Sequence, residues 1–198
     1  MNSKMMFTAA LILGAMGTAH ANLVTNGGFE TGDFAGWTQS GNTAFTAVTK
    51  TIDGFAPFAG EYFAYAGPVS SPGFISQKVD LPTVAGQQYT LSYALRNTDT
   101  PLTTAQTNHF RALWAGAEVK SLSLTNAAEF GWTVYTSDLI ATGATTELKF
   151  EFQNVSGYWD LDAVDVQAVP VPAAVWLFGS GLTGLIGMAM RKQQAGTA

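Results

Sequence analysis

Residues 89–96 read Tyr-Thr-Leu-Ser-Tyr-Ala-Leu-Arg, and here large apolar side chains alternate with small or polar ones. The same alternation occurs in residues 109–114, His-Phe-Arg-Ala-Leu-Trp, and in residues 148–153, Leu-Lys-Phe-Glu-Phe-Gln. Successive side chains of a β-strand point to opposite faces, so a period of two predicts strands with one buried face. Helical periodicity is absent from residues 22–168. This part of the chain is therefore predicted to be all-β.

Clusters of Gly, Asn, Asp and Pro separate the alternating stretches, as in Asn26-Gly27-Gly28, Ser71-Pro72-Gly73 and Ser156-Gly157. These residue types favour turns because they tolerate or preset the backbone angles that turns need. About eight to ten short strands fit into residues 22–168. We therefore expect a single antiparallel β-sandwich over this range.

The first 21 residues have the features of a signal peptide. Lys4 supplies a positive charge, an apolar stretch follows, and Ala19-His20-Ala21 forms a small-x-small cleavage site. We expect signal peptidase to remove residues 1–21 and the chain to be exported. A short membrane anchor is the alternative.

The other end predicts a transmembrane helix. Residues 173–190 carry no charge, and Arg191 and Lys192 follow them directly. A helix over this range would be roughly 27 Å long, close to the thickness of a bilayer's hydrocarbon core. The basic pair is typical of the cytoplasmic side and acts as the membrane stop, which leaves residues 193–198 as a cytoplasmic tail. A buried core helix is the alternative.

This tail also resembles a known sorting signal. Residues 169–182 read Val-Pro-Val-Pro-Ala-Ala-Val-Trp-Leu-Phe-Gly-Ser-Gly-Leu and, with the basic stop, are similar to the PEP-CTERM signal over residues 169–192. The motif corresponds to the VPxPA variant and consists of Val169, Pro170, Val171, Pro172 and Ala173. The resemblance implies cleavage by an exosortase-type membrane protease of a Gram-negative bacterium that makes exopolysaccharide. The residues alone predict only an anchor.

The middle of the chain resembles a second family. Residues 26–37 and 159–166 are similar to the opening and closing segments of jelly-roll domains of the carbohydrate-binding-module-like, galactose-binding-like type. Their closing strand often reads aromatic-x-Leu-Asp-Asp-Val-x-Val, and Ala163 stands here in place of the second Asp. The resemblance implies a jelly-roll β-sandwich over residues 22–168 and binding of glycans.

It also implies a structural calcium ion between the first and last strands, held by Glu30 and Asp162. Val164 and Val166 have the same parity as Asp162, so buried valines would place Asp162 inside the sandwich. A buried carboxylate needs a partner or an ion. The alternative is that Asp162 hydrogen-bonds to the turn at residues 26–28.

A glycan site needs polar side chains for sugar hydroxyls and aromatic rings for sugar faces. Outward strand positions and loop aromatics predict the ligand-binding residues Arg96, His109, Arg111, Glu151, Gln153, Trp132 and Tyr158. The alternative is that these polar residues are ordinary solvated surface. The same alternation predicts core positions for Trp37, Trp114, Phe150 and Phe152.

Several function classes are disfavoured. The chain has no cysteine, which excludes disulfides and thiol chemistry, and a net charge of -5, which opposes nucleic-acid binding. His109 is the only histidine beyond the signal peptide. Glycoside hydrolysis uses a pair of carboxylates, and the sequence offers pairs such as Glu147 with Glu151 and Asp160 with Asp162. Without a pocket, their spacing is no evidence of catalysis.

We therefore predict a non-enzymatic protein of the cell surface or extracellular matrix, associated with exopolysaccharide or biofilm and capable of binding glycans. A small polysaccharide-active enzyme and a purely structural matrix component are the alternatives.

Overall fold

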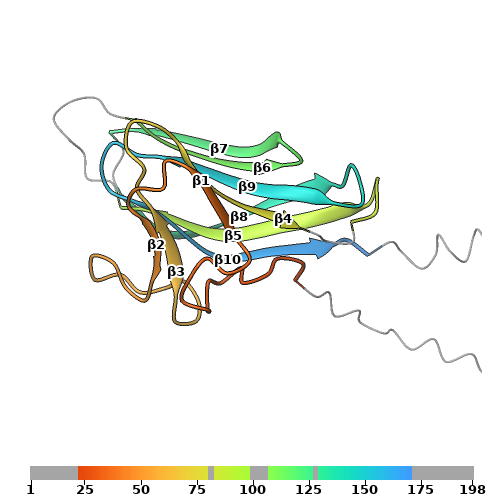
Figure 1. The fold of residues 1–198 in the computed structure, drawn as a ribbon, viewed down its shortest axis with the longest axis horizontal. Coiled ribbons are helices and arrows are strands. Elements are labelled where there is room, and N and C mark those ends of the chain that lie inside the picture. Colours follow the sequence, from red (N-terminus) through yellow and green to blue (C-terminus); the bar gives the residue numbers. More distant parts are fainter. Residues whose placement is uncertain (1–21, 80–82, 99–106, 127–128, 171–198) are drawn as a thin grey trace, which may run out of the picture.

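The computed structural model describes residues 22–79, 83–98, 107–126 and 129–170. Ten strands lie in these ranges and confirm the expected all-β domain (Figure 1). They are β1 (Thr38–Gly41), β2 (Thr46–Thr49), β3 (Phe63–Ala66), β4 (Gly73–Val79), β5 (Gln88–Asn97), β6 (Thr107–Trp114), β7 (Ala117–Thr125), β8 (Phe130–Ile140), β9 (Thr146–Gln153) and β10 (Trp159–Ala168). The strands form two five-stranded sheets, so the described domain is the β-sandwich that the alternation predicts.

Sheet I has the strand order β1-β4-β9-β6-β7, and sheet II has the order β2-β3-β10-β5-β8. Every pair of neighbouring strands in these orders runs antiparallel. The two sheets lie face to face in Figure 1, with β6 and β7 on one side and β10 on the other. Strands distant in sequence therefore become neighbours, and β9 lies between β4 and β6.

The core fills the space between the two sheets with alternate residues of each strand. Phe110 of β6 and Phe150 of β9 are fully buried, and their ring centroids lie 6.0 Å apart. Tyr93 of β5 reaches across from sheet II, with its ring centroid 5.3 Å from that of Phe150. All four predicted core residues are buried, which confirms that prediction: Trp37, Trp114, Phe150 and Phe152.

The N-terminal segment packs along the last strand. Leu23 N–H donates to the carbonyl of Val166 at 2.9 Å, and Val164 N–H donates to the carbonyl of Gly27 at 2.9 Å. A Cβ at Gly27 would overlap the Val164 carbonyl oxygen, so only glycine allows this approach. The first and last described residues therefore lie at the same end of the sandwich (Figure 1).

The parity predicted for the closing strand is wrong because β10 contains a β-bulge. The register of β10 against β5 shifts between Asp162 and Asp165, and Ala163 has a positive φ of 49°. Leu161 and Val164 both belong to the core cluster. A bulge adds one residue and reverses the alternation beyond it. Asp162 is buried as expected, but it lies on the outer face of sheet II beneath the segment between β2 and β3, whose Ala59 N–H donates to its carboxylate.

The predicted terminal segments lie outside the described residues. These are the signal peptide, the motif residues Val171, Pro172 and Ala173, the membrane segment of residues 173–190, and the stop at Arg191 and Lys192. Val169 and Pro170 are described and follow β10, and Val169 N–H donates to the carbonyl of Gln88. Within the described ranges, no helix has the length and apolar character of a membrane span.

Candidate functional site

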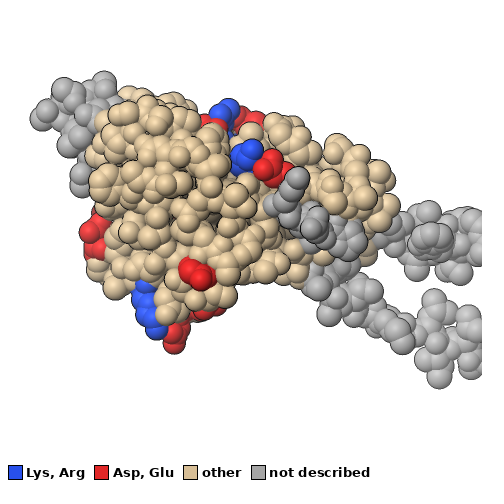
Figure 2. Space-filling model, in the orientation of Figure 1, with Lys and Arg blue, Asp and Glu red and all other residues tan. Residues whose placement is uncertain are grey.

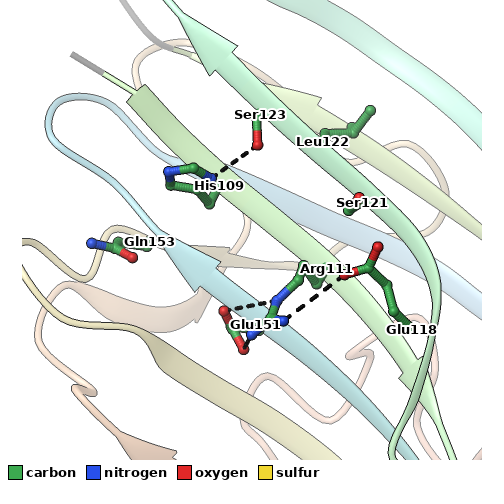
Figure 3. Close-up of a pocket in the computed structure, with 8 residues that line it drawn as sticks. All are labelled: His109, Arg111, Glu118, Ser121, Leu122, Ser123, Glu151 and Gln153. Atoms are coloured by element: carbon green, nitrogen blue, oxygen red, sulfur yellow. Dashed lines mark hydrogen bonds and ion pairs between the residues drawn. The ribbon is translucent and has the colours of Figure 1, made fainter.

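A groove of about 330 Å³ lies on the outer face of sheet I. His109 and Arg111 of β6 point away from the core because Phe110 and Ala112 point into it. The antiparallel register places Gln153 of β9 opposite His109. We call this cavity the glycan groove, after the ligand class that the sequence predicts for four of its residues. Its lining residues are His109, Arg111, Glu118, Ser121, Leu122, Ser123, Glu151 and Gln153 (Figure 3).

Arg111 forms the centre of the glycan groove. Its Nε donates to Glu151 Oε1 at 3.0 Å and its Nη2 donates to Glu151 Oε2, so the pair is bidentate. Glu118 of β7 approaches the same guanidinium, with 3.9 Å between Glu118 Oε2 and Arg111 Nη1. Figure 3 shows Arg111 between the two carboxylates. The hydrogen bonds that Arg111 donates to Glu151 raise the pKa of Arg111 above its ordinary value.

The two charged partners differ in exposure. The side chain of Glu151 is 10% exposed, whereas those of Arg111 and Glu118 are 42% and 45% exposed. Glu151 therefore holds the guanidinium in one orientation from below. Unused donors of Arg111 and acceptor lone pairs of both carboxylates remain at the groove surface.

Among the described residues, the end of the glycan groove around His109 contains polar groups and no Asp, Glu, Lys or Arg. His109 Nδ1 and Ser123 Oγ lie 3.0 Å apart and share a hydrogen bond, and Gln153 lies across β6 from Ser123. Imidazole, hydroxyl and amide groups supply both donors and acceptors. Together with Arg111 and its carboxylates, these groups can hydrogen-bond to several hydroxyls of a bound molecule.

The structure brings together four of the seven predicted ligand-binding residues, which are His109, Arg111, Glu151 and Gln153. Their strands are neighbours in sheet I, and their parity is as the alternation predicts. The prediction missed the β7 residues of the groove, including Glu118, Ser121 and Ser123. The alternation Ser-Leu-Ser-Leu at residues 121–124 is the signal that could have identified this strand and its outward serines.

The other three predicted residues lie elsewhere. Arg96 points outward as the alternation predicts, but it is only 2% exposed, so the exposure that the prediction assumed is absent. It lies on the outer face of sheet II, where Nε donates to Asp160 Oδ2 at 2.7 Å. Phe55 from the segment between β2 and β3 covers it, with the ring centroid 3.9 Å from Arg96 Cζ.

Trp132 belongs to β8 and not to a loop, and its ring lies over the guanidinium of Arg96 at 5.3 Å. Tyr158 precedes β10 and packs edge-on against Tyr65 at 5.2 Å. Neither ring lines the glycan groove, and the described lining of that groove contains no Phe, Tyr or Trp.

The predicted pair Glu30 and Asp162 does converge beside Gly28. A Cβ at Gly28 would lie 3.8 Å from both Asp162 Oδ1 and Glu30 Oε1. Burial raises the pKa of Asp162 to about 6, and the charge of Glu30 contributes in the same direction. Two carboxylates that converge on one point suit a shared cation.

Main-chain groups already hydrogen-bond to both carboxylates. Ala59 N–H donates to Asp162 Oδ2 at 3.0 Å, and Glu61 N–H donates to Glu30 Oε1 at 3.1 Å. Calcium needs six to eight oxygens, so the pair fits as its anionic ligands only if main-chain carbonyls supply the others. In the described part of the chain, no three His, Cys, Asp or Glu side chains form a metal-binding group. Structural calcium stays a prediction.

Three of the four acidic residues considered for catalysis have a basic partner. Glu147 lies 3.2 Å from Lys149 Nζ, Glu151 binds Arg111, and Asp160 binds Arg96. Asp160 and Asp162 share the buried outer face of sheet II and do not reach the glycan groove. The geometry of the groove therefore resembles a hydrogen-bonding surface more than an acid–base pair.

Known protein families and curated proteins give no match to this chain. Solved structures do match. A CBM61 carbohydrate-binding module solved with β-1,4-galactotriose has 19% identity and a TM-score of 0.56, covering 75% of this chain and 99% of the module. The xylan-binding CBM22-1 domain of Paenibacillus barcinonensis Xyn10C has 14% identity and a TM-score of 0.53, covering 77% of this chain and 97% of that domain.

A third match is the enzymatically active domain of tailspike protein 4 of bacteriophage CBA120. It has 16% identity and a TM-score of 0.51, and the match covers 75% of this chain but 21% of that domain. At these identities the likeness shows the fold alone. The described domain has the jelly-roll β-sandwich fold of carbohydrate-binding modules.

Proposed function

We propose that this protein binds polysaccharide in the glycan groove of sheet I. The observation that carries the proposal is the convergence of His109, Arg111, Glu151 and Gln153 in one cavity. A groove with fixed donors and acceptors suits a ligand rich in hydroxyl groups. The modules of the same fold that are named for galactotriose and xylan support this choice of ligand class.

The charges of the groove favour a neutral glycan over a polyanionic one. Arg111 is the basic side chain of the described lining, and Glu118 and Glu151 both neutralise it. A uronic acid would have to compete with these two carboxylates for one guanidinium. On the face shown in Figure 2, acidic and basic side chains lie scattered and form no continuous patch of one sign.

Binding at one groove is expected to be weak. Hydrogen bonds to solvated groups contribute little net free energy, and the described lining has no aromatic ring on which a sugar could stack. A Kd on the order of 1 mM, about −4 kcal/mol, is the appropriate scale. A surface that displays many copies would bind a polymer more tightly through avidity.

The proposal includes export and sorting. Residues 1–21 would be removed by signal peptidase, and residues 169–192 would hold the precursor in the inner membrane until an exosortase-type protease releases it to the surface or matrix. The first and last described residues lie at one end of the sandwich, which would leave the sides of both sheets accessible (Figure 1). Mass spectrometry of the exported protein tests this, because an intact residue 198 in that pool would contradict the processing.

Affinity electrophoresis against neutral and uronic-acid polysaccharides tests the groove itself. We expect Arg111→Ala to abolish the retardation that neutral polysaccharide causes. Lys50→Ala is the matched control, because Lys50 also forms an exposed ion pair, with Glu61, but lies at the end of β2 in sheet II. Equal retardation of Arg111→Ala and the unmodified protein would refute the groove as the site. Release of reducing ends during the assay would favour the enzyme instead.

A further inference from the structure

A second pocket, of about 140 Å³, lies at one end of sheet II. Its lining includes Arg96 of β5 and Phe130 of β8. It also includes Phe55, from the segment between β2 and β3, and Glu129, which directly precedes β8. We call this cavity the arginine pocket. It shares no lining residue with the glycan groove, which belongs to the other sheet.

Arg96 is a buried charge with an unused hydrogen-bond donor. Its Nε and Nη2 both donate to Asp160 Oδ2, at 2.7 Å and 2.5 Å. Among the described residues, Arg96 Nη1 and Asp160 Oδ1 have no hydrogen-bond partner. Buried polar atoms are almost always paired, so an ion pair with one unpaired donor and one unpaired acceptor is unusual and needs an explanation.

Aromatic rings surround the same guanidinium. The Phe55 ring centroid lies 3.9 Å from Arg96 Cζ, and the Trp132 ring lies on it at 5.3 Å. Phe130 forms part of the pocket wall. The pocket therefore combines apolar ring faces with a lining arginine that has an unpaired donor, a combination that the glycan groove lacks.

We propose that the arginine pocket binds one neutral six-membered sugar ring, at a site separate from the glycan groove. A cavity of about 150 Å³ holds one benzene ring, so the pocket of about 140 Å³ has room for the ring of a pyranose but not for all of its hydroxyls. A pyranose presents an apolar face to aromatic rings and hydroxyls at its edge, which can accept a hydrogen bond from Arg96.

The local charges exclude an anionic ligand. Asp160 already neutralises Arg96, Glu129 lines the pocket, and Asp53 adds a further negative charge close to Asp160. A carboxylate or phosphate would meet more negative than positive charge. The same arrangement tolerates a neutral polyol.

Access requires a movement of Phe55. Arg96 Nη1 has no solvent-accessible surface, because the guanidinium lies beneath the Phe55 ring. Phe55 is 41% exposed and ends a tight turn in which its N–H donates to the Ile52 carbonyl at 2.8 Å. A sugar ring would displace the Phe55 ring from the guanidinium and then stack against it.

The indole of Trp132 provides the readout. Its Nε1–H donates to the carbonyl of Ala56, the residue after Phe55, at 3.0 Å. A displacement of Phe55 therefore changes the ¹H–¹⁵N resonance of this indole, which Trp132→Phe assigns. The full-length chain is titrated with D-galactose, D-glucose and D-galacturonate up to about 100 mM, well above millimolar affinity.

We expect at least one neutral hexose to shift the Trp132 resonance saturably and D-galacturonate to bind at least tenfold more weakly. Phe55→Ala should weaken the hexose at least tenfold. Phe45→Ala, which removes an equally large ring that is 65% exposed and not part of the pocket lining, should leave affinity within twofold. Arg111→Ala should also leave it unchanged, which separates this site from the glycan groove.

Three results would overturn the proposal. These are the absence of a saturable shift with either hexose, equal weakening by Phe55→Ala and Phe45→Ala, and tighter binding of D-galacturonate than of D-galactose. Loss of the shift in Arg111→Ala would assign the hexose to the glycan groove and would also count against the arginine pocket.

Discussion

Asp162 makes the stability of the domain depend on pH in an unusual direction. Burial raises its pKa from the ordinary 3.8 to about 6, so the folded state favours the protonated carboxyl. This contribution to stability is fully present below about pH 4 and is lost as the pH rises through 6. The difference between the two pKa values corresponds to about 3 kcal/mol. Without calcium, the domain should therefore lose most of this, about 2 kcal/mol, between pH 4 and pH 7 on account of Asp162.

Urea unfolding at pH 4, 5, 6 and 7 in the presence of a chelator measures the effect, followed by tryptophan fluorescence. Asp162→Asn replaces the carboxyl by a neutral amide of the same size. We expect the variant to escape the loss, so that the free energy of unfolding of the unmodified protein falls by about 2 kcal/mol relative to it across this range. The test compares how the free energy of unfolding changes with pH in the two proteins, so it remains valid even if the variant is less stable at every pH.

Asp160 and Asp165 titrate in the same direction, since burial also raises their pKa values, but both are present in the two proteins and cancel from the difference. Asp138→Asn is the control, because Asp138 is exposed on β8 and its replacement should leave the profile unchanged. Parallel profiles for Asp162→Asn and the unmodified protein would refute the assignment of the pH dependence to Asp162.

Three further predictions follow from the packing and the carboxylates. Calcium at 100 times its Kd should stabilise the protein at pH 7 by about 2.7 kcal/mol and raise the Tm by roughly 5–10 °C. Asp162→Ala should remove this shift. If calorimetry finds no shift in the unmodified protein, the calcium prediction is wrong. Gly27→Ala should cost about 1–3 kcal/mol in urea unfolding, because the new Cβ meets the Val164 carbonyl, whereas Gly131→Ala, with open space around its Cβ, should cost almost nothing. Equal costs would disprove the close approach. Phe150→Ala should cost about 3–5 kcal/mol, because the side chain is fully buried between the sheets, and a cost below about 1 kcal/mol would contradict that packing.

Much of the candidate site could be predicted from local sequence. The parity of His109 and Arg111 followed from their alternation with Phe110 and Ala112, because the period of two is a property of each strand alone. Residues 148–153 gave the same result for Glu151 and Gln153. The prediction failed for Arg96, although it alternates just as regularly with its neighbours. Parity assigns a side chain to a face of the sheet, but it does not reveal whether another segment covers that face.

The closing strand shows a second limit. Ala163 interrupts the alternation of β10 with a positive φ, and this reverses the face of every residue beyond it. Alanine is not a residue type that marks a left-handed position, so no local signal announces the bulge. Asp162 is buried as predicted, but the predicted reason was wrong. The segment that contains Ala59 covers it on the outer face of sheet II, and it does not enter the core.

The sequence by itself determined that the domain is all-β, that residues 89–96, 109–114 and 148–153 form strands with one buried face, and that the composition is acidic and cysteine-free. It could do so because alternation, turn residues and charge act within a few residues of each other. Only the tertiary structure decided that β6 lies between β7 and β9, which assembles the glycan groove, and that Phe55 covers Arg96, which creates the arginine pocket. It also decided that Glu30 meets Asp162. These outcomes depend on pairing between segments far apart in the chain, and the free energy that selects them comes from burying the whole core at once.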